Sequence, residues 1–503
     1  MIPVLNTLAR NPGGSRASDA GVVVGAILAG STLGYLLIWA VLRRRVPPGL
    51  VPLLGLIAVF LFYGKTAVGS LVRQASGVPP AATLAALLLA LGVIVWQLGR
   101  RPAVADRVNT FLALTSVLMV GWLTARILTN HFRSRSILQR SVLAAELARP
   151  IESRIPPGAA PRPDIYLLVL DEYAHAAVLR NVFGFDNRAF EDSLRQLGFT
   201  IPQMVRSNYV HTLLSLPSLL NFSHLTRLAA DVGTRSNNAS LPNYLLEHNR
   251  TAAYLKQQGY RFLFYPSQWW PSTRHNRNAD WEYDAWPGFH PGQELSRSDL
   301  RRALIRTTSF DYFIRDDAWD ADFVRRTLAA LESVPTRAEP TFAFAHILSP
   351  HWPYVFGADC RPTGNIQISG RADRQRAYID QLQCLNRLIL RTVSTILERS
   401  PVPPVILLQG DHGTNLRRYT EAPSAREVTA AQSSERFGAF GAYFAPGGGH
   451  SLFADSITVV NVLQKVLSYY AGADVPASSD SLFVSLEQTP YDFAPVDPAD
   501  LLY

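Results

Sequence analysis

The sequence predicts an α/β domain with a mostly parallel sheet, preceded by an all-α membrane domain of about four spans. Its 503 residues exceed what one hydrophobic core usually supports, so two parts are expected. Residues 1–150 hold 15 Lys and Arg against 3 Asp and Glu, whereas the rest of the chain holds 33 against 36. The net charge of +9 therefore belongs to an apolar N-terminal part with basic loops, which argues against a nucleic-acid partner.

Four apolar segments predict the membrane spans, at residues 20–41, 50–63, 81–98 and 108–123. The first and third have the length of roughly 18 to 20 residues that a spanning helix needs. The second is short and carries Pro52, so a re-entrant segment is the alternative, and the fourth reaches full length only if it includes Arg126. The first segment ends in three arginines rather than a small-residue cleavage site, which argues against a signal peptide.

The charges of the connecting loops predict the orientation. Basic residues are concentrated in the first and third loops: Arg43, Arg44, Arg45, Arg100, Arg101 and Arg107. The loop between them holds only Lys65 and Arg73, and the positive-inside rule then places the chain beyond residue 130 outside the cytoplasm. Arg133, Arg135 and Arg140 count against this assignment. We expect an integral protein of the cytoplasmic membrane with its second domain on the extracytoplasmic face.

The predicted domain limits are 1–149 for the membrane domain, 150–162 for a Pro- and Gly-rich linker and 163–503 for the α/β domain. Both cysteines, Cys360 and Cys384, fall in the outer part, where a disulfide could persist. A bridge and two buried free thiols are both compatible with their spacing.

Short apolar runs alternate with helical patterns in the outer part. Buried strands are expected at 164–170, 261–266, 341–348 and 405–410, and helices at 187–199, 243–260 and 373–400. This alternation predicts a mostly parallel sheet. The chain has no Walker A loop and no GxGxxG after a strand, so the nucleotide-binding folds built on those motifs are disfavoured.

Polar residues follow three of the predicted strands. They are Asp171 and Glu172 after the first strand, His346 and His351 at and beyond the third, and Asp411 and His412 after the fourth. Ligands of open α/β sheets bind beyond the carboxyl ends of the strands, and mixed carboxylate and imidazole groups suit zinc or manganese. For each Asp the alternative is a turn or cap residue, and for His346 it is a buried core histidine.

A hydroxyl-rich stretch at 207–221 is the candidate source of a nucleophile. Ser215 is expected to cap a helix with Pro217 in its first turn, which gives Ser215 a structural role. Thr212 has no such role and would lie near the positive end of that helix. A hydroxyl needs a metal or a base to become nucleophilic near neutral pH. His450 or Glu435 could bind a second ion, but a surface position explains either of them better.

Several motifs resemble those of the alkaline phosphatase superfamily, in particular its sulfatase-like, membrane-anchored branch of phosphoethanolamine transferases and lipoteichoic acid synthases. "TLLSLP" resembles the nucleophile motif and implies Thr212, "DHG" implies Asp411 and His412 as metal ligands, and "VLDEY" implies Asp171, with Glu172 as the alternative. "HILSPHWPY" resembles the stretch that holds the substrate phosphate and implies His351 and His346.

The resemblance implies a two-step transfer. One divalent ion, zinc first with manganese or magnesium as alternatives, would be bound by Asp171, Thr212, Asp411 and His412. Thr212 would take the headgroup of a phospholipid donor and pass it to a glycan or glycolipid acceptor on the outer face. A membrane-anchored phosphodiesterase, phosphatase or sulfatase-like hydrolase is one alternative, and a non-catalytic membrane protein that keeps the fold is another. The chain departs from the branch in its two cysteines, its four predicted spans and the "TNLRRY" that follows "DHG".

Overall fold

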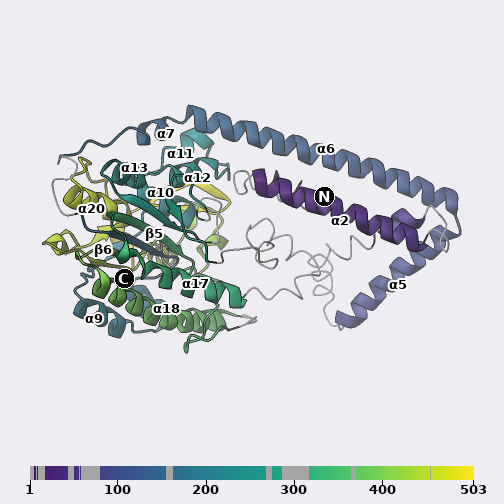
Figure 1. Cartoon of the computed structure of the whole chain (residues 1–503). Helices are drawn as coiled ribbons and strands as arrows, with labels where there is room; N and C mark the ends of the chain where they lie inside the picture. Colours follow the sequence, from purple (N-terminus) through teal and green to yellow (C-terminus); the bar gives the residue numbers. More distant parts are fainter. Residues whose placement is uncertain are drawn as a thin grey trace. The chain divides into compact units, whose positions relative to one another are not determined.

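The computed structural model describes most of the chain. The described residues are 5–6, 8–9, 17–42, 50–55, 57, 80–154, 162–267, 273, 275–285, 317–363, 370–453 and 455–503. Contacts divide the chain into two units, one of which contains residues 1–133 and the other residues 134–288 with 316–503. Figure 1 labels the helices and strands of both units.

Nearly all described residues of the first unit are helical. Its long helices are α2 (Ala17–Leu42), α5 (Pro80–Gly99) and α6 (Pro102–Arg140). Of the described helices, α6 alone is long and apolar enough to cross a membrane, with a mean hydropathy of 1.8 over its most apolar window. Its Leu118 and Trp122 side chains are exposed. Predicted segments one, three and four lie within these helices, whereas most of the second lies outside the described residues. The four-span domain stays a prediction.

The second unit contains a six-stranded sheet with the order β4-β3-β5-β1-β6-β7. Neighbouring strands are parallel except β6 and β7, which are antiparallel. The strands of this unit are β1 (Ile165–Leu170), β2 (Val205–Arg206), β3 (Arg261–Tyr265), β4 (Trp281–Glu282), β5 (Thr341–Ile347), β6 (Val405–Gly410), β7 (Gly441–Phe444), β8 (Ile457–Thr458), β9 (Leu482–Leu486) and β10 (Thr489–Val496). The mostly parallel sheet and its four predicted strands are confirmed.

Helices cover both faces of this sheet (Figure 1). The helices of this unit are α7 (Val142–Leu147), α8 (Ala176–Phe183), α9 (Arg188–Gln196), α10 (Thr212–Asn221), α11 (Leu228–Val232), α12 (Ser240–Glu247), α13 (Arg250–Gln257), α17 (Asp317–Leu331), α18 (Arg371–Arg399), α19 (Ala430–Phe437) and α20 (Val462–Tyr470). Alternate residues of β1 belong to two hydrophobic clusters, one with α8, α9, α17 and α18 and the other with α10, α13 and α20. All of β1 is buried, which explains its unbroken apolar sequence.

Two details of the secondary structure differ from the prediction. The helix expected at 243–260 is two helices, α12 and α13, because the Asn249 side chain accepts a hydrogen bond from Ala252 N and starts a new helix. The antiparallel strand β7 and the hairpin β9–β10 were not predicted. β7 contains Gly441, β10 contains Pro490 and Pro495, and β9 is only five residues long.

Cys360 and Cys384 form a disulfide, which resolves the two possibilities left by the sequence. Cys384 lies on the buried face of α18, and Cys360 lies in the segment that follows β5. The bridge therefore ties the segment after β5 to a core helix. Within the predicted linker, Ser153 forms an isolated bridge with Ala473, and the rest of the segment beyond Arg154 lies largely outside the described residues.

Asp164, the residue before β1, makes the stability of the domain depend on pH. Its carboxylate accepts a hydrogen bond from Thr341 N at 2.8 Å. Burial raises the pKa of Asp164 to about 6, and the bond from Thr341 opposes this only in part. Because the folded pKa exceeds the unfolded one, the folded state binds the proton more tightly. The stabilisation of the folded state by protonated Asp164 is complete below about pH 4 and is lost as the pH rises through about 6.

We therefore expect Asp164→Asn to match the wild type in thermal stability near pH 4 and to be more stable by about 1 kcal/mol at pH 7. Asn keeps an oxygen that can accept from Thr341 N, so the difference reports the charge. Thermal unfolding of both proteins between pH 4 and 7 measures it. Parallel curves for the two proteins would contradict the assignment to Asp164.

Candidate metal centre and nucleophile

The register of three parallel strands brings the candidate residues to one edge of the sheet. Leu170 at the end of β1 pairs with Ile347 of β5 and with Gly410 of β6. Asp171 and Asp411 are therefore the first residues beyond aligned strand ends. Since parallel strands present their carboxyl ends at the same edge, the proximity of the two side chains follows from the topology.

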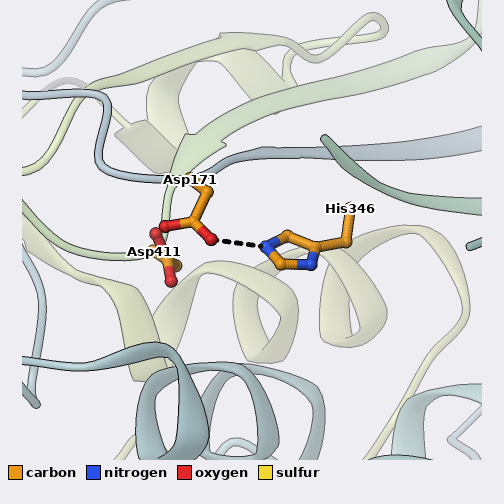
Figure 2. A group of neighbouring side chains, drawn as sticks. All are labelled: Asp171, His346 and Asp411. Atoms are coloured by element: carbon orange, nitrogen blue, oxygen red, sulfur yellow. Dashed lines mark ion pairs between the residues drawn. The ribbon is translucent and has the colours of Figure 1, made fainter. Parts of the chain in front are cut away.

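Asp171, Asp411 and His346 form a buried cluster, in which Asp171 lies next to both of the others (Figure 2). One ligand atom from each of the three lies within 4.8 Å of the other two. His346 Nε2 is 3.3 Å from Asp171 Oδ2, while its Nδ1 contacts Ser267 Oγ at 2.9 Å. The sequence placed His346 behind His351 as a phosphate-binding residue. The geometry adds a second candidate role, that of a nitrogen ligand beside the two carboxylates.

The cluster has the properties of a cation site. Both oxygens of Asp171, Oδ2 of Asp411 and Nε2 of His346 are buried without a hydrogen-bond partner. Buried polar atoms are normally paired, and two facing carboxylates without a cation are unfavourable. Two oxygen donors with imidazole nitrogen are a ligand set that zinc accepts. The residues present therefore fit a divalent metal ion.

The pKa values of the two carboxyl groups diverge, as expected for a close like-charged pair. Burial and the charge of Asp171 raise the pKa of Asp411 well above its usual value. Burial alone would raise the pKa of Asp171, but the neighbouring His351, His346 and His412 outweigh it and lower that pKa. The pair thus holds one negative charge more easily than two. A bound cation would remove this conflict.

Thr212 is the first residue of α10, and His211 is its N-cap. The prediction that Ser215 caps this helix is wrong, because Leu214 N and Ser215 N already bond to His211 O and close the first turn there. Ser215 lies inside the helix, as does Pro217, and the Ser215 hydroxyl donates to Asp411 O. The bond fastens the start of α10 to the segment that carries Asp411 and His412.

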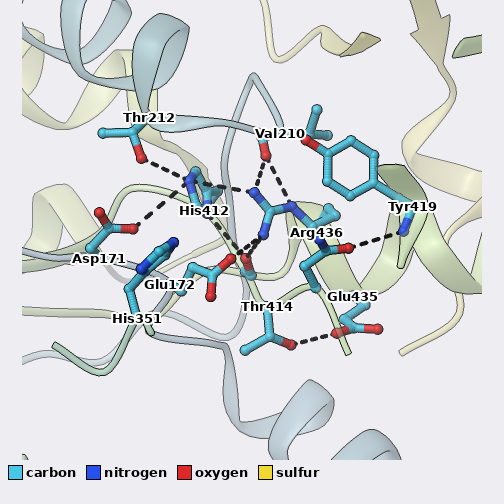
Figure 3. Close-up of polar contacts among 12 residues, drawn as sticks. Asp171, Glu172, Val210, Thr212, His351, His412, Thr414, Tyr419, Glu435 and Arg436 are labelled. Atoms are coloured by element: carbon cyan, nitrogen blue, oxygen red, sulfur yellow. Dashed lines mark hydrogen bonds and ion pairs between the residues drawn. The ribbon is translucent and has the colours of Figure 1, made fainter. Parts of the chain in front are cut away.

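The Thr212 hydroxyl faces His412, with 3.0 Å between Oγ1 and Nε2 (Figure 3). His412 Nδ1 lies 3.0 Å from Gly413 O, and a carbonyl only accepts, so the proton of a neutral ring resides on Nδ1. Burial and the charge of Arg436 lower the pKa of His412 well below its usual value, which keeps the ring neutral. The free electron pair on Nε2 is thus directed at Thr212. It can accept the threonine proton or bind a metal ion.

The remaining members of the predicted ligand set lie close to this nitrogen. His412 Nε2 is 3.3 Å from Asp411 Oδ2 and 4.0 Å from Asp171 Oδ1. The structure therefore brings Asp171, Thr212, Asp411 and His412 together. Gly413 is explained by packing, since a Cβ there would collide with the carbonyl oxygen of Glu435.

His351 lies on the segment after β5, and its backbone N–H donates to Asp171 O at 3.0 Å. Its Nδ1 contacts its neighbour's carbonyl, Trp352 O, which assigns the Nδ1 proton to that bond. Burial lowers the pKa of His351, but the charges of Glu172 and Asp171 raise it more, so the net pKa is above its usual value. His351 is therefore suited to donate a proton near neutral pH.

Arg436 of α19 is a site residue that the sequence reasoning missed. Its buried guanidinium donates to Val210 O, to Gly413 O and to the Glu172 carboxylate, and its Nη2 is 3.4 Å from His412 Nε2 (Figure 3). Glu172, named as the alternative metal ligand, is thus the partner of Arg436 at 2.7 Å. One side chain links the segments that carry Asp171, Thr212 and His412. The sequence offered no signal for it beyond a charged residue at a helix end.

Glu435 and His450, which the sequence offered as ligands of a second ion, differ in their exposure to solvent. Glu435 is buried, which corrects the expectation of a surface residue, and its carboxylate accepts bonds from Thr414 Oγ1, Leu416 N and Arg417 N. It therefore shapes the segment after His412. His450 is exposed in a short 3₁₀ turn, as a surface residue would be.

Comparison with solved structures gives distant matches. The C-terminal periplasmic domain of EcEptC from Escherichia coli is 13% identical, with a TM-score of 0.47, and the match covers 71% of this chain and 98% of that one. The corresponding domain of the phosphoethanolamine transferase EptC from Campylobacter jejuni is 10% identical, with a TM-score of 0.40 and coverages of 62% and 90%. BT1596, a 2-O GAG sulfatase, is 14% identical, with a TM-score of 0.40 and coverages of 65% and 78%. No curated protein matches the chain.

The family-level comparison is decisive. The model of the Sulfatase family matches residues 167–457, which is more than half of the chain and includes Asp171, Thr212, His351 and the Asp411–His412 pair. The predicted alkaline phosphatase-like fold is confirmed by this match and by the mostly parallel sheet. The chain belongs to the sulfatase family.

Proposed function

We propose that the protein is a metal-dependent transferase that moves a phospholipid headgroup through a covalent phospho-threonine at Thr212 to an outer-face glycan or glycolipid. The observation that carries the proposal is the 3.0 Å contact between Thr212 Oγ1 and His412 Nε2, next to two facing buried carboxylates. Members of the family are enzymes. The resemblance of "TLLSLP" to the nucleophile motif of membrane-anchored transferases supports Thr212 in particular.

The proposed ion would be held by Asp171, Asp411 and a histidine nitrogen, from His412 as the motif implies or from His346 as the geometry allows. When bound, a divalent ion lowers the pKa of a hydroxyl and neutralises charge on phosphate oxygens. Zinc is our first choice because the set mixes carboxylate oxygen and imidazole nitrogen, with manganese or magnesium as alternatives.

The first step begins at Thr212. Its Oγ1 forms a bond to phosphorus as the bond from phosphorus to the diacylglycerol oxygen breaks. With His346 as the nitrogen ligand, His412 Nε2 keeps its free electron pair and accepts the Thr212 proton along the existing hydrogen bond. His351 gives a proton to the leaving oxygen, a contribution typically worth 10²- to 10⁴-fold. In the second step an acceptor hydroxyl forms a bond to phosphorus and gives its proton to His351. The bond from phosphorus to Thr212 Oγ1 breaks, and Thr212 regains its proton from His412.

The position of Thr212 contributes to this chemistry. As the first residue of α10, it lies where unpaired backbone N–H groups and the helix dipole favour a negatively charged group. A phosphoryl group attached to Oγ1 would lie at that end of the helix. Predicted anchoring in the cytoplasmic membrane, with the α/β domain on the extracytoplasmic face, would keep this site close to phospholipid donors.

The decisive experiment is intact-mass analysis of full-length protein after incubation with zinc and phospholipid vesicles. The wild type is expected to gain the mass of one phosphorylated headgroup, and Thr212→Ala is expected to gain none and to lose at least 10³-fold in transfer. Thr226→Ala, at a nearby position outside the cluster, is the control and should keep the adduct. An adduct on Thr212→Ala would exclude Thr212 as the nucleophile.

The fate of the adduct separates transfer from hydrolysis. Radiolabelled headgroup should appear in a glycan or glycolipid fraction if the proposal is correct. Release of the label into water alone would favour a phosphodiesterase or phosphatase of the same fold. Protein without bound metal and without any adduct would favour a non-catalytic member of the family.

A further inference from the structure

The segment that carries His351 is fastened from one side by a single buried amide, that of Gln381 on α18. Gln381 Nε2 donates to Pro350 O and to His351 O, both at 3.0 Å. Its Oε1 accepts from Val355 N at 2.6 Å and from Phe356 N at 3.4 Å. The side chain is fully buried, so no solvent can replace these bonds.

These four contacts occupy the whole hydrogen-bonding capacity of a carboxamide, which has two N–H donors and two acceptor electron pairs. All of them go to backbone groups between residues 350 and 356. Gln381 therefore has no free donor or acceptor for a substrate or an ion. Any effect that it has on chemistry must pass through the segment that it holds.

Two further contacts from the same helix fasten the far end of the segment. Cys384 forms the disulfide with Cys360, and the Arg387 guanidinium donates to Ala358 O. Residues 381, 384 and 387 are spaced by three and share one side of α18. Of the three attachments, the one at Gln381 alone reaches the backbone of His351 itself.

The other side of His351 is held by the end of β1, because its N–H donates to Asp171 O. The peptide groups on both sides of His351 are thus fixed, one by the residue that follows β1 and one by α18. A histidine that transfers a proton must hold its ring within hydrogen-bonding distance of the reacting oxygen, so a small displacement of its backbone has a large effect on rate.

We propose that Gln381 is the positioning residue for His351 in the transfer reaction, an inference that rests on the proposed function. The amide closes the segment 350–356 into one conformation and holds the His351 carbonyl, while the carbonyl of Asp171 holds the His351 N–H. None of the four hydrogen bonds of Gln381 goes to Thr212 or to the carboxylate cluster, so we expect metal binding and the nucleophile to change little when Gln381 is replaced.

Two variants test this inference in full-length protein reconstituted in phospholipid vesicles with zinc. Gln381→Glu keeps the size of the side chain but replaces the donor of two bonds with an acceptor, and Gln381→Leu removes all four bonds. We expect kcat for headgroup transfer to fall about 10- to 100-fold, as for other residues that orient a catalytic group, with KM and bound metal changed less than about twofold.

The discriminating measurement is a double-mutant cycle with His351→Ala. If Gln381 acts only through His351, adding either Gln381 variant to His351→Ala should lower kcat by less than about twofold. The matched control is Gln375→Leu on the same helix, whose side chain donates to Phe183 O rather than to the 350–356 segment. It should leave kcat within about twofold of its parent in both backgrounds.

Hydrogen exchange supplies a readout that needs no activity. The amides of Val355 and Phe356 should exchange faster in Gln381→Leu than in the wild type, while peptides around Asp411 stay protected. The inference would be overturned if the Gln381 variants lowered kcat as much in His351→Ala as in the wild type, or if hydrogen exchange at residues 355 and 356 were unchanged. Either result would leave the proposed function intact. Wild-type protein that forms no Thr212 adduct would overturn both together.

Discussion

Replacing Asp411 by Asn is expected to raise the thermal midpoint of the metal-free protein and to abolish its stabilisation by zinc. The two effects have opposite signs because the same carboxylate is unfavourable without a cation and required with one. Asp411 is buried beside Asp171, and both burial and that charge raise its pKa. Near neutral pH the metal-free fold must therefore either protonate Asp411 or tolerate two facing charges.

The isosteric change preserves the rest of the local structure. Asp411 Oδ1 accepts from Glu172 N at 3.2 Å and from His412 N at 3.0 Å, and the Asn oxygen can accept both bonds. The new amide nitrogen replaces Oδ2, which has no hydrogen-bond partner and faces His412 and Asp171. The substitution thus removes a charge and supplies a donor next to two acceptors, His412 Nε2 and the Asp171 carboxylate.

The sign of the pH dependence follows from the raised pKa. A carboxyl group with a raised folded pKa favours the folded state at low pH, and this contribution is lost as the pH rises. Asp411→Asn should therefore match the metal-free wild type near pH 4 and exceed it at pH 7, by about 1 to 3 kcal/mol or a few degrees in Tm. Thermal unfolding in chelator at both pH values measures this difference.

Zinc should reverse the order of the two proteins. Zinc at about 1,000 times Kd adds about 4.1 kcal/mol to the wild type by mass action, which exceeds the advantage of about 1 to 3 kcal/mol that Asp411→Asn has without metal. Zinc should add nothing to Asp411→Asn. Headgroup transfer should fall on the order of 10³-fold. Asp186→Asn is the control, because Asp186 is exposed, pairs with Arg188 and should leave the response to zinc unchanged. A variant that is destabilised without metal or still stabilised by zinc would show that the carboxylates are not a cation site.

The central part of the site could be predicted because it follows from local sequence and topology. β1, β5 and β6 are short, buried and mainly apolar, and polar residues at or just after their ends must lie at the carboxyl edge of the sheet. The proximity of Asp171 and Asp411 needs no information beyond strand order and register. The fold itself followed from the same alternation of strands and helices.

The supporting residues could not be predicted because their partners are remote in sequence. Arg436 contacts residues that precede it by 23, 226 and 264 positions, and nothing in "SSERFG" distinguishes a buried arginine from one at the exposed end of a helix. Gln381 lies in a helix whose pattern gives its buried face but not the backbone groups that it binds. The sequence placed the start of α10 at Ser215 because serine is a preferred cap residue. The helix begins earlier because His211 has the extended φ and ψ of an N-cap, and these angles cannot be read from residue preferences.

Replacing Arg436 by Lys is expected to lower headgroup transfer about 100-fold although the positive charge is kept. The guanidinium holds Val210 O, Gly413 O and the Glu172 carboxylate with donors that point in different directions in one plane. A lysine ammonium is a single point and cannot reach all three acceptors. These three acceptors lie close in sequence to Thr212, His412 and Asp171, respectively two residues before, one after and one after. Losing the contacts is therefore expected to displace the nucleophile relative to its partners.

Replacing Arg436 by Met separates charge from geometry. It leaves the Glu172 carboxylate without a partner in a largely buried position, which should cost about 3 to 5 kcal/mol of stability. Adding Glu172→Gln should recover part of that stability, because the unpaired charge is gone, but none of the activity. The control pair is Arg426–Asp492, which is exposed and 3.3 Å apart, where the same substitutions should change stability by less than about 1 kcal/mol.

Thermal unfolding and headgroup transfer are measured for the wild type, Arg436→Met, Glu172→Gln and the double variant. Together they show whether Arg436 acts through its charge or through its geometry. If charge were its whole contribution, Arg436→Lys would retain wild-type transfer, and neutralising Glu172 would rescue activity together with stability. If geometry decides, stability and activity separate, since Gln at residue 172 relieves the electrostatic penalty while the carbonyls of Val210 and Gly413 still lack their shared donor. The contacts favour the second result, because two of the three groups that Arg436 holds are neutral carbonyls and gain little from charge alone.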